Sequence, residues 1–245
     1  MVDGIGYEFM EKSKYKYLSE SFQKRGSPQP PLELPYDTSI QTIPLVSSEQ
    51  LPSYPIELKT AIEKRKTCRR YQQSSLSLEE LTYLLWITQG VREVSDTTRT
   101  SRNVPSAGAR HAIETYLAIN RVDGLNLGLY RYLALEHALL PINADPDVSH
   151  KVSQACTNQQ HVLNSAVTFV WVAVKERMYW RYGERGYRYL HLDAGHVCQN
   201  LYLGAEAVGC GVCAIAAFDD DQLNAVLGLD GDNCFAIYLG SLGKR

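Results

Sequence analysis

The most informative stretch of the sequence reads RYLHLDAGHVCQNLYLGAEAVGCGVCAIAAF and spans residues 188–218. Apolar side chains recur in its first two thirds at helical spacing, as at Ala194, Val197 and Leu201. Other apolar residues lie off that stripe, so the pattern predicts a long, buried central helix. Gly209 suits the left-handed conformation that ends many helices, and we expect the helix to stop there.

Small residues are frequent in this helix and in the segment after it. Gly195 and Gly204 would let another element approach closely, and Gly211 follows in an apolar segment. A buried helix followed by small residues suits a flat ligand that lies against backbone. The spacing Gly-x-Gly-x-x-Ala at residues 209–214 matches a dinucleotide fingerprint, but that fingerprint follows a strand. Because a helix precedes it here, we predict no Rossmann site.

Composition excludes several classes of protein. The chain has 245 residues, of which 44% are hydrophobic and 21% are charged, and its net charge is −2. This near-neutral charge argues against a nucleic-acid partner. The longest apolar run, residues 166–174, is too short to span a bilayer, and the N-terminus lacks the apolar core of a signal peptide. We therefore expect a cytoplasmic protein with no membrane partner.

The cysteines and histidines predict no metal site. Cys210 and Cys213 form a C-x-x-C, but no second such pair or nearby His/Cys pair completes a zinc cage. A thioredoxin-like pair would follow a strand and open a helix, whereas this one follows a helix. His191 and His196 are five residues apart and so do not share a helix face. We expect the cysteines to serve packing.

The chain divides into an arm and a compact domain. Residues 28–55 contain seven of the ten prolines, which excludes regular helix and central strand. We interpret residues 1–55 as an extended N-terminal arm that wraps a core or a partner subunit. Residues 56–245 are expected to form one ligand-binding domain.

Local patterns predict an α+β fold, with helices around a mostly antiparallel sheet. A proline at position 55 is expected to open a helix through Ile62, and Ser77 with Glu80 forms a capping box for the next helix, which ends at Gly90. Residues 92–103 are expected to be a polar loop. A further helix is expected at 145–156, and a short one after Asp219. The expected strands are residues 113–120, 127–132, 166–174 and 234–239.

Four stretches could carry chemistry. Arg65, Lys66, Thr67 and Arg69 lie in a basic run that is either a solvated helix end or an anion clamp, in which Arg65 and Arg69 would share a helix face. Residues 105–109, Pro-Ser-Ala-Gly-Ala, read as a turn into a short helix, whose free N–H groups can bind anions or carbonyl oxygens.

The other two stretches are aromatic or small in character. Residues 179–189 hold five aromatic and three arginine side chains, which suits base stacking, a wet interface or a lid over a ring-shaped ligand. Residues 209–218 are the small-residue segment described above.

Together these stretches, in this order, resemble the FMN-dependent nitroreductase family, and within it the SagB/ThcOx-type branch that includes azoline dehydrogenases of peptide natural products. The resemblance covers roughly residues 56–245, and the arm is similar to the extension of stand-alone SagB-type proteins. It implies a homodimer that binds FMN at the subunit interface.

The resemblance also implies roles for individual residues. By this resemblance the basic run would bind the FMN phosphate, ribityl chain and pyrimidine edge. The Pro-Ser-Ala-Gly-Ala loop would contact the flavin that is bound mainly by the other subunit. The resemblance assigns a side-chain amide contact to Asn158, or to Gln159 if the register slips, and a backbone N–H donor to flavin N5 to Ala216 or Ala217. The cofactor residues so implied are Arg65, Lys66, Thr67, Arg69, Pro105, Ser106, Ala107, Gly108, Asn158, Gln159, Ala216 and Ala217.

Two positions depart from the family pattern. Many nitroreductases have a Glu-Gly pair where this chain has Ala216-Ala217, which keeps the backbone donor and loses the carboxylate. Azoline dehydrogenases carry a catalytic Lys-Tyr pair whose counterpart here is Arg181-Tyr182. Arginine holds its proton too tightly to act as a general base, whereas Tyr182 could donate or relay a proton.

The function implied is hydride transfer through FMN N5 between a donor, NAD(P)H being one option, and a small-molecule or peptide substrate. Two alternatives stay open at this point. One is dehydrogenation of a peptide thiazoline or oxazoline, and the other is a flavin-binding protein without catalysis.

Overall fold

The computed structural model describes residues 4–95 and 98–245. Its centre is a seven-stranded sheet of order β1-β6-β5-β4-β7-β9-β8, in which all neighbouring strands are antiparallel. The sheet strands are β1 (Ile43–Pro44), β4 (Ile113–Ile119), β5 (Gly128–Leu133), β6 (Ala138–Asn143), β7 (Val167–Val174), β8 (Cys210–Ile215) and β9 (Cys234–Lys244). The expected α+β class with a mostly antiparallel sheet is confirmed.

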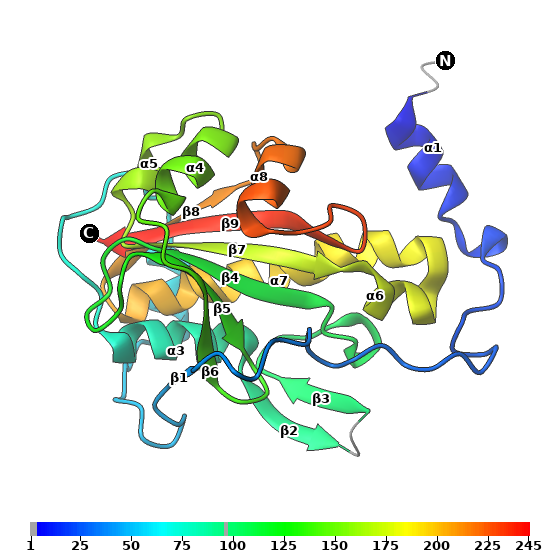
Figure 1. Ribbon diagram of the computed structural model, residues 1–245, viewed down its shortest axis with the longest axis horizontal. Coiled ribbons are helices and arrows are strands. Elements are labelled where there is room, and N and C mark those ends of the chain that lie inside the picture. Colours follow the sequence, from blue (N-terminus) through cyan, green and yellow to red (C-terminus); the bar gives the residue numbers. More distant parts are fainter. Residues whose placement is uncertain (1–3, 96–97) are drawn as a thin grey trace.

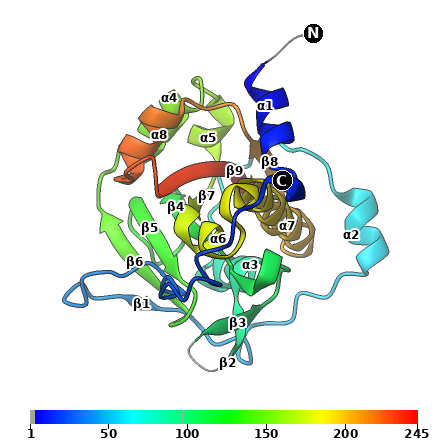
Figure 2. The same ribbon diagram turned by 90° about the vertical axis from the view of Figure 1, so that its right-hand side faces the viewer.

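Helices cover both faces of this sheet (Figures 1 and 2). One face carries α3 and α7, with α6 beside α7, and the other carries α4, α5 and α8. The α-helices are α1 (Ile5–Lys12), α2 (Leu58–Lys64), α3 (Leu78–Gln89), α4 (Val148–Ala155), α5 (Gln160–Asn164), α6 (Lys175–Tyr182), α7 (Gly186–Ala207) and α8 (Asp220–Leu227). Short 3-10 turns form η1 (Tyr15–Tyr17), η2 (Ala107–Ala109) and η3 (Gly183–Arg185).

The central strands are apolar throughout because both faces are covered. In β7, Phe169 and Trp171 point into the core under α7, while Val170 and Val172 point into the core under α4 and α8. This alternation is the two-residue period of a strand. A run that looks uniformly apolar in sequence therefore fills two separate cores.

The long central helix is confirmed as α7. It begins two residues before the quoted stretch, at Gly186, and Gly209 follows its end with φ 64°. At Gly204 a Cβ would lie 1.9 Å from Ile87 Cδ1, so the absence of a side chain lets α3 pack closely. In the single chain a narrow stripe of α7 stays exposed, at His191, Leu192, Gly195, His196 and Gln199.

Other helix and strand ends were confirmed in some elements and shifted in others. The Ser77 capping box is present, with the Glu80 amide donating to Ser77 Oγ at 3.2 Å, and α3 ends before Gly90. The helix expected to open at residue 55 begins at Leu58 instead. The last strand continues past the expected residue 239 to Lys244 because it pairs with both β7 and β8.

Several expectations were wrong. The polar loop expected at 92–103 contains a two-stranded hairpin of β2 (Val91–Ser95) and β3 (Arg99–Arg102); positions 96 and 97 lie outside the described residues. The small-residue segment after Gly209 is the edge strand β8. Neither α6 nor β6 was expected, because the first lacks an apolar stripe and the second contains a proline, Pro141.

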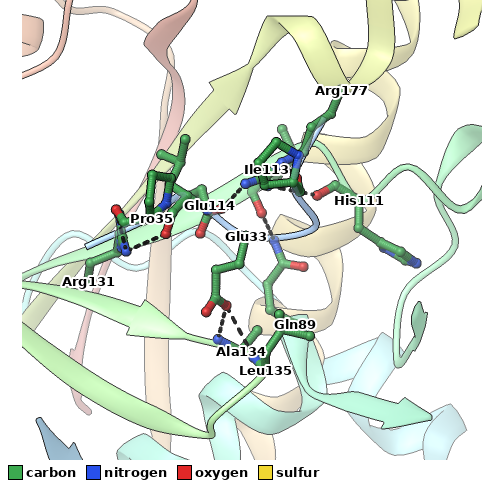
Figure 3. Close-up of polar contacts among 12 residues, drawn as sticks. Glu33, Pro35, Gln89, His111, Ile113, Glu114, Arg131, Ala134, Leu135 and Arg177 are labelled. Atoms are coloured by element: carbon green, nitrogen blue, oxygen red, sulfur yellow. Dashed lines mark hydrogen bonds and ion pairs between the residues drawn. The ribbon is translucent and has the colours of Figure 1, made fainter. Parts of the chain in front are cut away.

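Within residues 4–55, the chain begins with α1 and then runs along its own core with little regular structure (Figure 1). A buried polar network holds it there (Figure 3). Arg177 Nη2 and Glu114 Oε1 are 2.5 Å apart, Arg177 Nε donates to the Pro31 carbonyl at 2.7 Å, and the Leu34 amide donates to Glu114 Oε1 at 2.9 Å. Burial would raise the pKa of Glu114, but neighbouring arginines outweigh it and hold that pKa below its usual range. The arm wraps its own subunit here.

Candidate functional site

The basic run after α2 is extended and lies against β8. The Cys68 amide donates to the Val212 carbonyl at 2.8 Å, and Thr67 forms a parallel bridge with Val212. The helix face expected for Arg65 and Arg69 is therefore wrong, since α2 ends at Lys64. In an extended chain alternate residues share a side, so Arg65, Thr67 and Arg69 can still face one ligand.

The expectation that small residues after α7 leave space for a flat ligand is wrong at Gly211. A Cβ at Gly211 would lie 2.5 Å from the Cβ of Cys68. The close approach that this glycine permits is made by the chain itself rather than by a flat ligand. The residues that remain open are further along, at Ala216 and Ala217, which follow β8 and are exposed.

The two arginines of the run reach different neighbours of β8. Arg65 Cζ lies 5.3 Å from the centre of the Tyr202 ring, and the Tyr202 hydroxyl accepts a hydrogen bond from the Ala214 amide at 3.0 Å. Arg69 lies beside His161, whose pKa is lowered first by burial and then by the Arg69 charge. Both cations thus border the same strand.

A side-chain amide joins this group. Gln159 Nε2 donates to the Ala217 carbonyl at 3.1 Å. Asn158 is exposed and has φ 59°, a left-handed conformation that asparagine tolerates better than most residues. Within the described chain, the amide nitrogens of Ala216 and Ala217 donate to no acceptor. We call Arg65, Thr67, Arg69, Asn158, Gln159, Ala216 and Ala217 the β8 cluster. Lys66 is exposed and makes no hydrogen bond or ion pair among the described residues.

A second group forms around the Pro-Ser-Ala-Gly-Ala loop at the other half of α7. Ser106 Oγ donates to Asp193 Oδ2 at 2.5 Å, and the Ala107 amide donates to Asp193 Oδ1 at 3.3 Å. Ser106 Oγ also accepts from the His111 amide at 2.8 Å. Burial raises the pKa of Asp193, and the Ser106 hydrogen bond opposes that shift. Sequence reasoning missed Asp193, whose signal was a carboxylate between Leu192 and Ala194 in a mostly buried helix.

The loop is held in an unfavourable conformation. Gly108, Ala109 and His111 have φ of 59°, 53° and 44°. The last two carry a Cβ, and each such residue costs on the order of 1 kcal/mol or more. The bonds to Asp193 and the packing around His111, which is buried, keep the loop in this shape.

Arg181 and Tyr182 lie against this loop. A Cβ at Gly108 would be 2.4 Å from Tyr182 Oη and 2.9 Å from Arg181 Nε, so both side chains occupy the space that glycine leaves. Arg181 Cζ lies 5.6 Å from the centre of the Tyr182 ring. We call residues 105–108 with Arg181 and Tyr182 the loop cluster. The structure therefore brings together two stretches that the sequence separates by more than 70 residues.

The single chain does not bring the two clusters together. Asp193 anchors the loop cluster and Tyr202 borders the β8 cluster, and both lie on α7. Nine residues of helix separate them by about 14 Å at 1.5 Å per residue.

Other candidate sites carry little chemistry. Cys210 and Cys213 are buried and free, and burial raises the pKa of Cys210 to about 12, so its thiol stays protonated at neutral pH. Among residues 4–95 and 98–245, no three metal-binding side chains group together. The same residues form no helix with the length and apolar character needed to cross a membrane.

The described structure defines an α+β protein with an antiparallel sheet between two helical layers. Comparison with protein-family models identifies it further: the Nitroreductase family model matches residues 62–243, so the chain belongs to the nitroreductase family of oxidoreductases.

Two relatives illustrate its range. A Methanocaldococcus jannaschii protein described as a nitroreductase is 35% identical over 179 residues, which cover 73% of this chain and 88% of that one. The trifolitoxin-processing protein TfxB of Rhizobium leguminosarum bv. trifolii is 27% identical over 165 residues, which cover 64% of this chain and 44% of TfxB. This chain therefore spans less than half of that second protein.

Solved structures share the fold. A nitroreductase structure from Anabaena variabilis aligns with a TM-score of 0.69 and 29% identity over 85% of this chain and 42% of that one. The Escherichia coli microcin synthetase McbBCD complex, bound to truncated pro-MccB17, contains a chain that aligns at 0.62 and 20% identity over 97% of this chain and 86% of its own. A Desulfovibrio desulfuricans nitroreductase structure in complex with FMN aligns at 0.55 and 18% identity over 78% and 87%.

Proposed function

We propose that the protein is an FMN-dependent oxidoreductase that passes hydride between a donor and an acceptor. The observation that carries the proposal is the β8 cluster, in which cations, a side-chain amide and free backbone amides converge beside one strand. Family membership supports it, as does the FMN bound to the D. desulfuricans relative.

The β8 cluster fits the chemical character of FMN. Arg65 and Arg69 would hold the phosphate or the pyrimidine edge, since guanidinium groups match phosphate oxygens with paired donors. Thr67 and Asn158 or Gln159 would supply neutral hydrogen bonds. The free amides of Ala216 and Ala217 fit as donors toward the ring, because a donor with no protein acceptor can serve a ligand at little cost. Lys66 would contribute charge from the surface.

When bound, FMN would accept and release hydride at N5. The residues of this chain would then do two things. Arg65 and Arg69 would offset negative charge that develops in the site, and Ala216 or Ala217 would donate an N–H to the reacting edge. Tyr182 Oη is available to donate or relay a proton, whereas a guanidinium group such as that of Arg181 is a poor general base.

The proposal includes a homodimer. The loop cluster of one subunit would complete the β8 cluster of the other, as the resemblance to the family implies; within one chain the two clusters lie about 14 Å apart along α7. The exposed stripe on α7, in which the Leu192 side chain is exposed by 60%, offers a surface for that contact. A nicotinamide, NADH or NADPH, is the proposed donor.

A second candidate is dehydrogenation of a thiazoline or oxazoline in a peptide. The resemblance to TfxB and to the McbBCD chain, whose structure holds a peptide precursor, favours it. In both cases the hydride would be exchanged with FMN held by the same β8 cluster. A third reading, a flavin-binding protein without turnover, predicts bound FMN that no donor reduces.

Flavin retention tests the proposal. The purified protein is expected to be yellow and to release FMN on heating. Arg65→Ala and Arg69→Ala should each weaken FMN binding by about ten- to a hundredfold, because a charge-assisted hydrogen bond contributes about 1.5–3 kcal/mol. Arg70→Ala removes a neighbouring exposed arginine on the alternate side of the extended segment and should leave the FMN dissociation constant within about twofold.

Equal FMN affinity in all four proteins would remove the clamp assignment. Turnover then separates the readings: NADH or NADPH should bleach the flavin absorbance in stopped flow, and a nitroaromatic or a quinone should restore it. Flavin that stays oxidised with both nicotinamides, and is not re-oxidised after chemical reduction, supports the binding protein instead.

A further inference from the structure

A cavity of about 430 Å³ lies between the N-terminal arm and the end of α6. Arm residues between positions 15 and 24 form one side, including Leu18, Glu20 and Lys24, and Arg181 with Tyr182 forms the other. This volume falls within the range of small-molecule sites. Figure 1 shows the arm leaving α1 and passing the end of α6, which places the two walls side by side.

The arm wall is fixed at both ends. Upstream, Arg188 Nε donates to Ser13 Oγ at 2.7 Å and Arg185 Nη1 donates to the Ser13 carbonyl at 2.9 Å. Downstream, the Gln23 amide donates to the Trp180 carbonyl at 2.9 Å, and Trp180 Nε1 donates to the Ser27 carbonyl at 2.9 Å. Because the anchoring residues lie on α6, on η3 and at the start of α7, the arm is held across the cavity.

The cavity is electropositive. Arg181 is half-buried and makes no hydrogen bond or ion pair with any described residue, although its guanidinium carries five N–H donors. Lys24 adds a second cation on the opposite wall, and Glu20 is the one carboxylate among the lining residues described. Arg110 is close enough to feel the charge of Arg181: the pKa of Arg110 is lowered first by burial and then by that charge. An anion in the cavity would relieve this repulsion.

The cavity also adjoins the proposed reaction site. Arg181 Nε and Tyr182 Oη both lie against Gly108 of the loop cluster, which the proposed function places on the flavin. A molecule in the cavity would therefore touch Tyr182, which lines it. A planar guanidinium is a poor base but a good partner for a carboxylate, which accepts two parallel N–H donors from it.

We propose that this cavity binds the carboxylate of the substrate, with Arg181 as its main ligand and Lys24 of the arm as the second. This inference rests on the proposed function, which supplies the hydride exchange at the other end of the same substrate. It assigns the arm a role in specificity: Lys24 selects organic acids over neutral molecules of the same shape. Arg181 then acts as a binding residue, and Tyr182 remains the residue that can donate or relay a proton.

Binding of a matched pair of probes tests this inference. The full-length protein is titrated by calorimetry with 4-nitrobenzoate and with its neutral isostere 4-nitrobenzamide at low ionic strength. The wild-type protein should bind the acid more tightly than the amide. Lys24→Glu should weaken the acid about fivefold, the upper range for one exposed ion pair, and should change the dissociation constant of the amide by less than about twofold.

Lys16→Glu is the matched control. Lys16 lies on the same arm but does not line the cavity. The Lys16→Glu substitution therefore makes the same change in net charge outside the cavity. Equal affinity for the two probes in the wild-type protein, or an equal loss of acid affinity in Lys16→Glu, overturns the inference. Flavin content is measured in the same samples: protein without FMN contradicts the proposed function, whereas protein that holds FMN but shows no acid preference contradicts only this inference.

Discussion

At the scale of single residues, the loop cluster depends on groups that are expensive to place. Ala109 and His111 are left-handed residues with a Cβ, and Asp193 is a buried carboxylate. Hydrogen bonds among neighbours hold this arrangement: Asp193 accepts hydrogen bonds from Ser106 and Ala107, and Ser106 accepts one from the His111 amide. The loop conformation is therefore a property of the set rather than of any one residue.

His111 makes stability depend on pH. Burial lowers its pKa from 6.5 to about 3, so the unfolded chain binds a proton between these values and the folded chain does not. The stabilising effect of neutral His111 is thus present above pH 6.5 and is lost as pH falls toward 3. For this one group we expect the free energy of unfolding to fall by about 2 kcal/mol between pH 7 and pH 5.

His111→Asn is the informative variant, because asparagine tolerates the left-handed backbone without titrating. Urea unfolding at pH 7 and pH 5 should show a smaller pH effect in this variant than in the wild-type protein. His150→Asn, at an exposed residue of α4, should keep the wild-type pH effect. The same pH effect in all three proteins would show that His111 is not the group responsible.

At the scale of elements, α7 connects the two clusters and carries the exposed stripe. Its buried residues pack on the sheet and on α3, whereas Leu192, Gly195 and His196 face outward. At Gly195 no heavy atom comes within 4 Å of where a Cβ would be, so the stripe has room for the close approach of another helix. These features suit a contact between two copies of α7.

Leu192→Arg should break that contact. A charge buried at a helix–helix interface without a partner is strongly unfavourable, so we expect a shift from dimer to monomer in sedimentation, together with loss of most bound FMN. Leu127→Arg changes another exposed leucine, at the turn before β5, and should leave both properties unchanged. A monomeric wild-type protein that holds FMN would contradict the proposed shared site.

At the scale of the whole molecule, the arm is part of the fold. Arg177 and Arg131 donate to carbonyls of residues 31–35, and Glu33 Oε1 accepts from the Ala134 amide at 2.6 Å and the Leu135 amide at 3.1 Å (Figure 3). These contacts fix the arm upstream of β1, and those of Ser13, Gln23 and Ser27 hold residues 15–24 beside α6.

Glu33→Ala should loosen this attachment. Two backbone amides would lose their buried acceptor, at about 1–3 kcal/mol of unfolding free energy. Hydrogen exchange at Ala134 and Leu135 should become faster, and proteolytic cleavage within residues 28–36 should increase. Glu49→Ala, at an exposed arm residue after β1, should change neither measurement. Unaltered exchange in Glu33→Ala would mean that the remaining contacts hold the arm alone.

Local patterns predicted much of this fold. The helical spacing of α7, the Ser77 capping box and the apolar strands β4 and β7 were recognisable because each is recorded in neighbouring residues. The basic run and the Pro-Ser-Ala-Gly-Ala loop were singled out from residue type and order, and Ala216-Ala217 from the resemblance to the family; their roles toward FMN stay predictions. The hairpin β2–β3 and helix α6 were missed because their polar sequences lack a clear period.

The sequence by itself therefore determined the long helix, the central strands and the family, since these depend on side chains within a few residues of one another. Only the tertiary structure decided that Ser106 meets Asp193, 87 residues away, that Gly108 makes room for Arg181 and Tyr182, and that Lys24 faces Arg181 across a cavity. Such pairings depend on how packed elements meet in space, which no periodicity along the chain records.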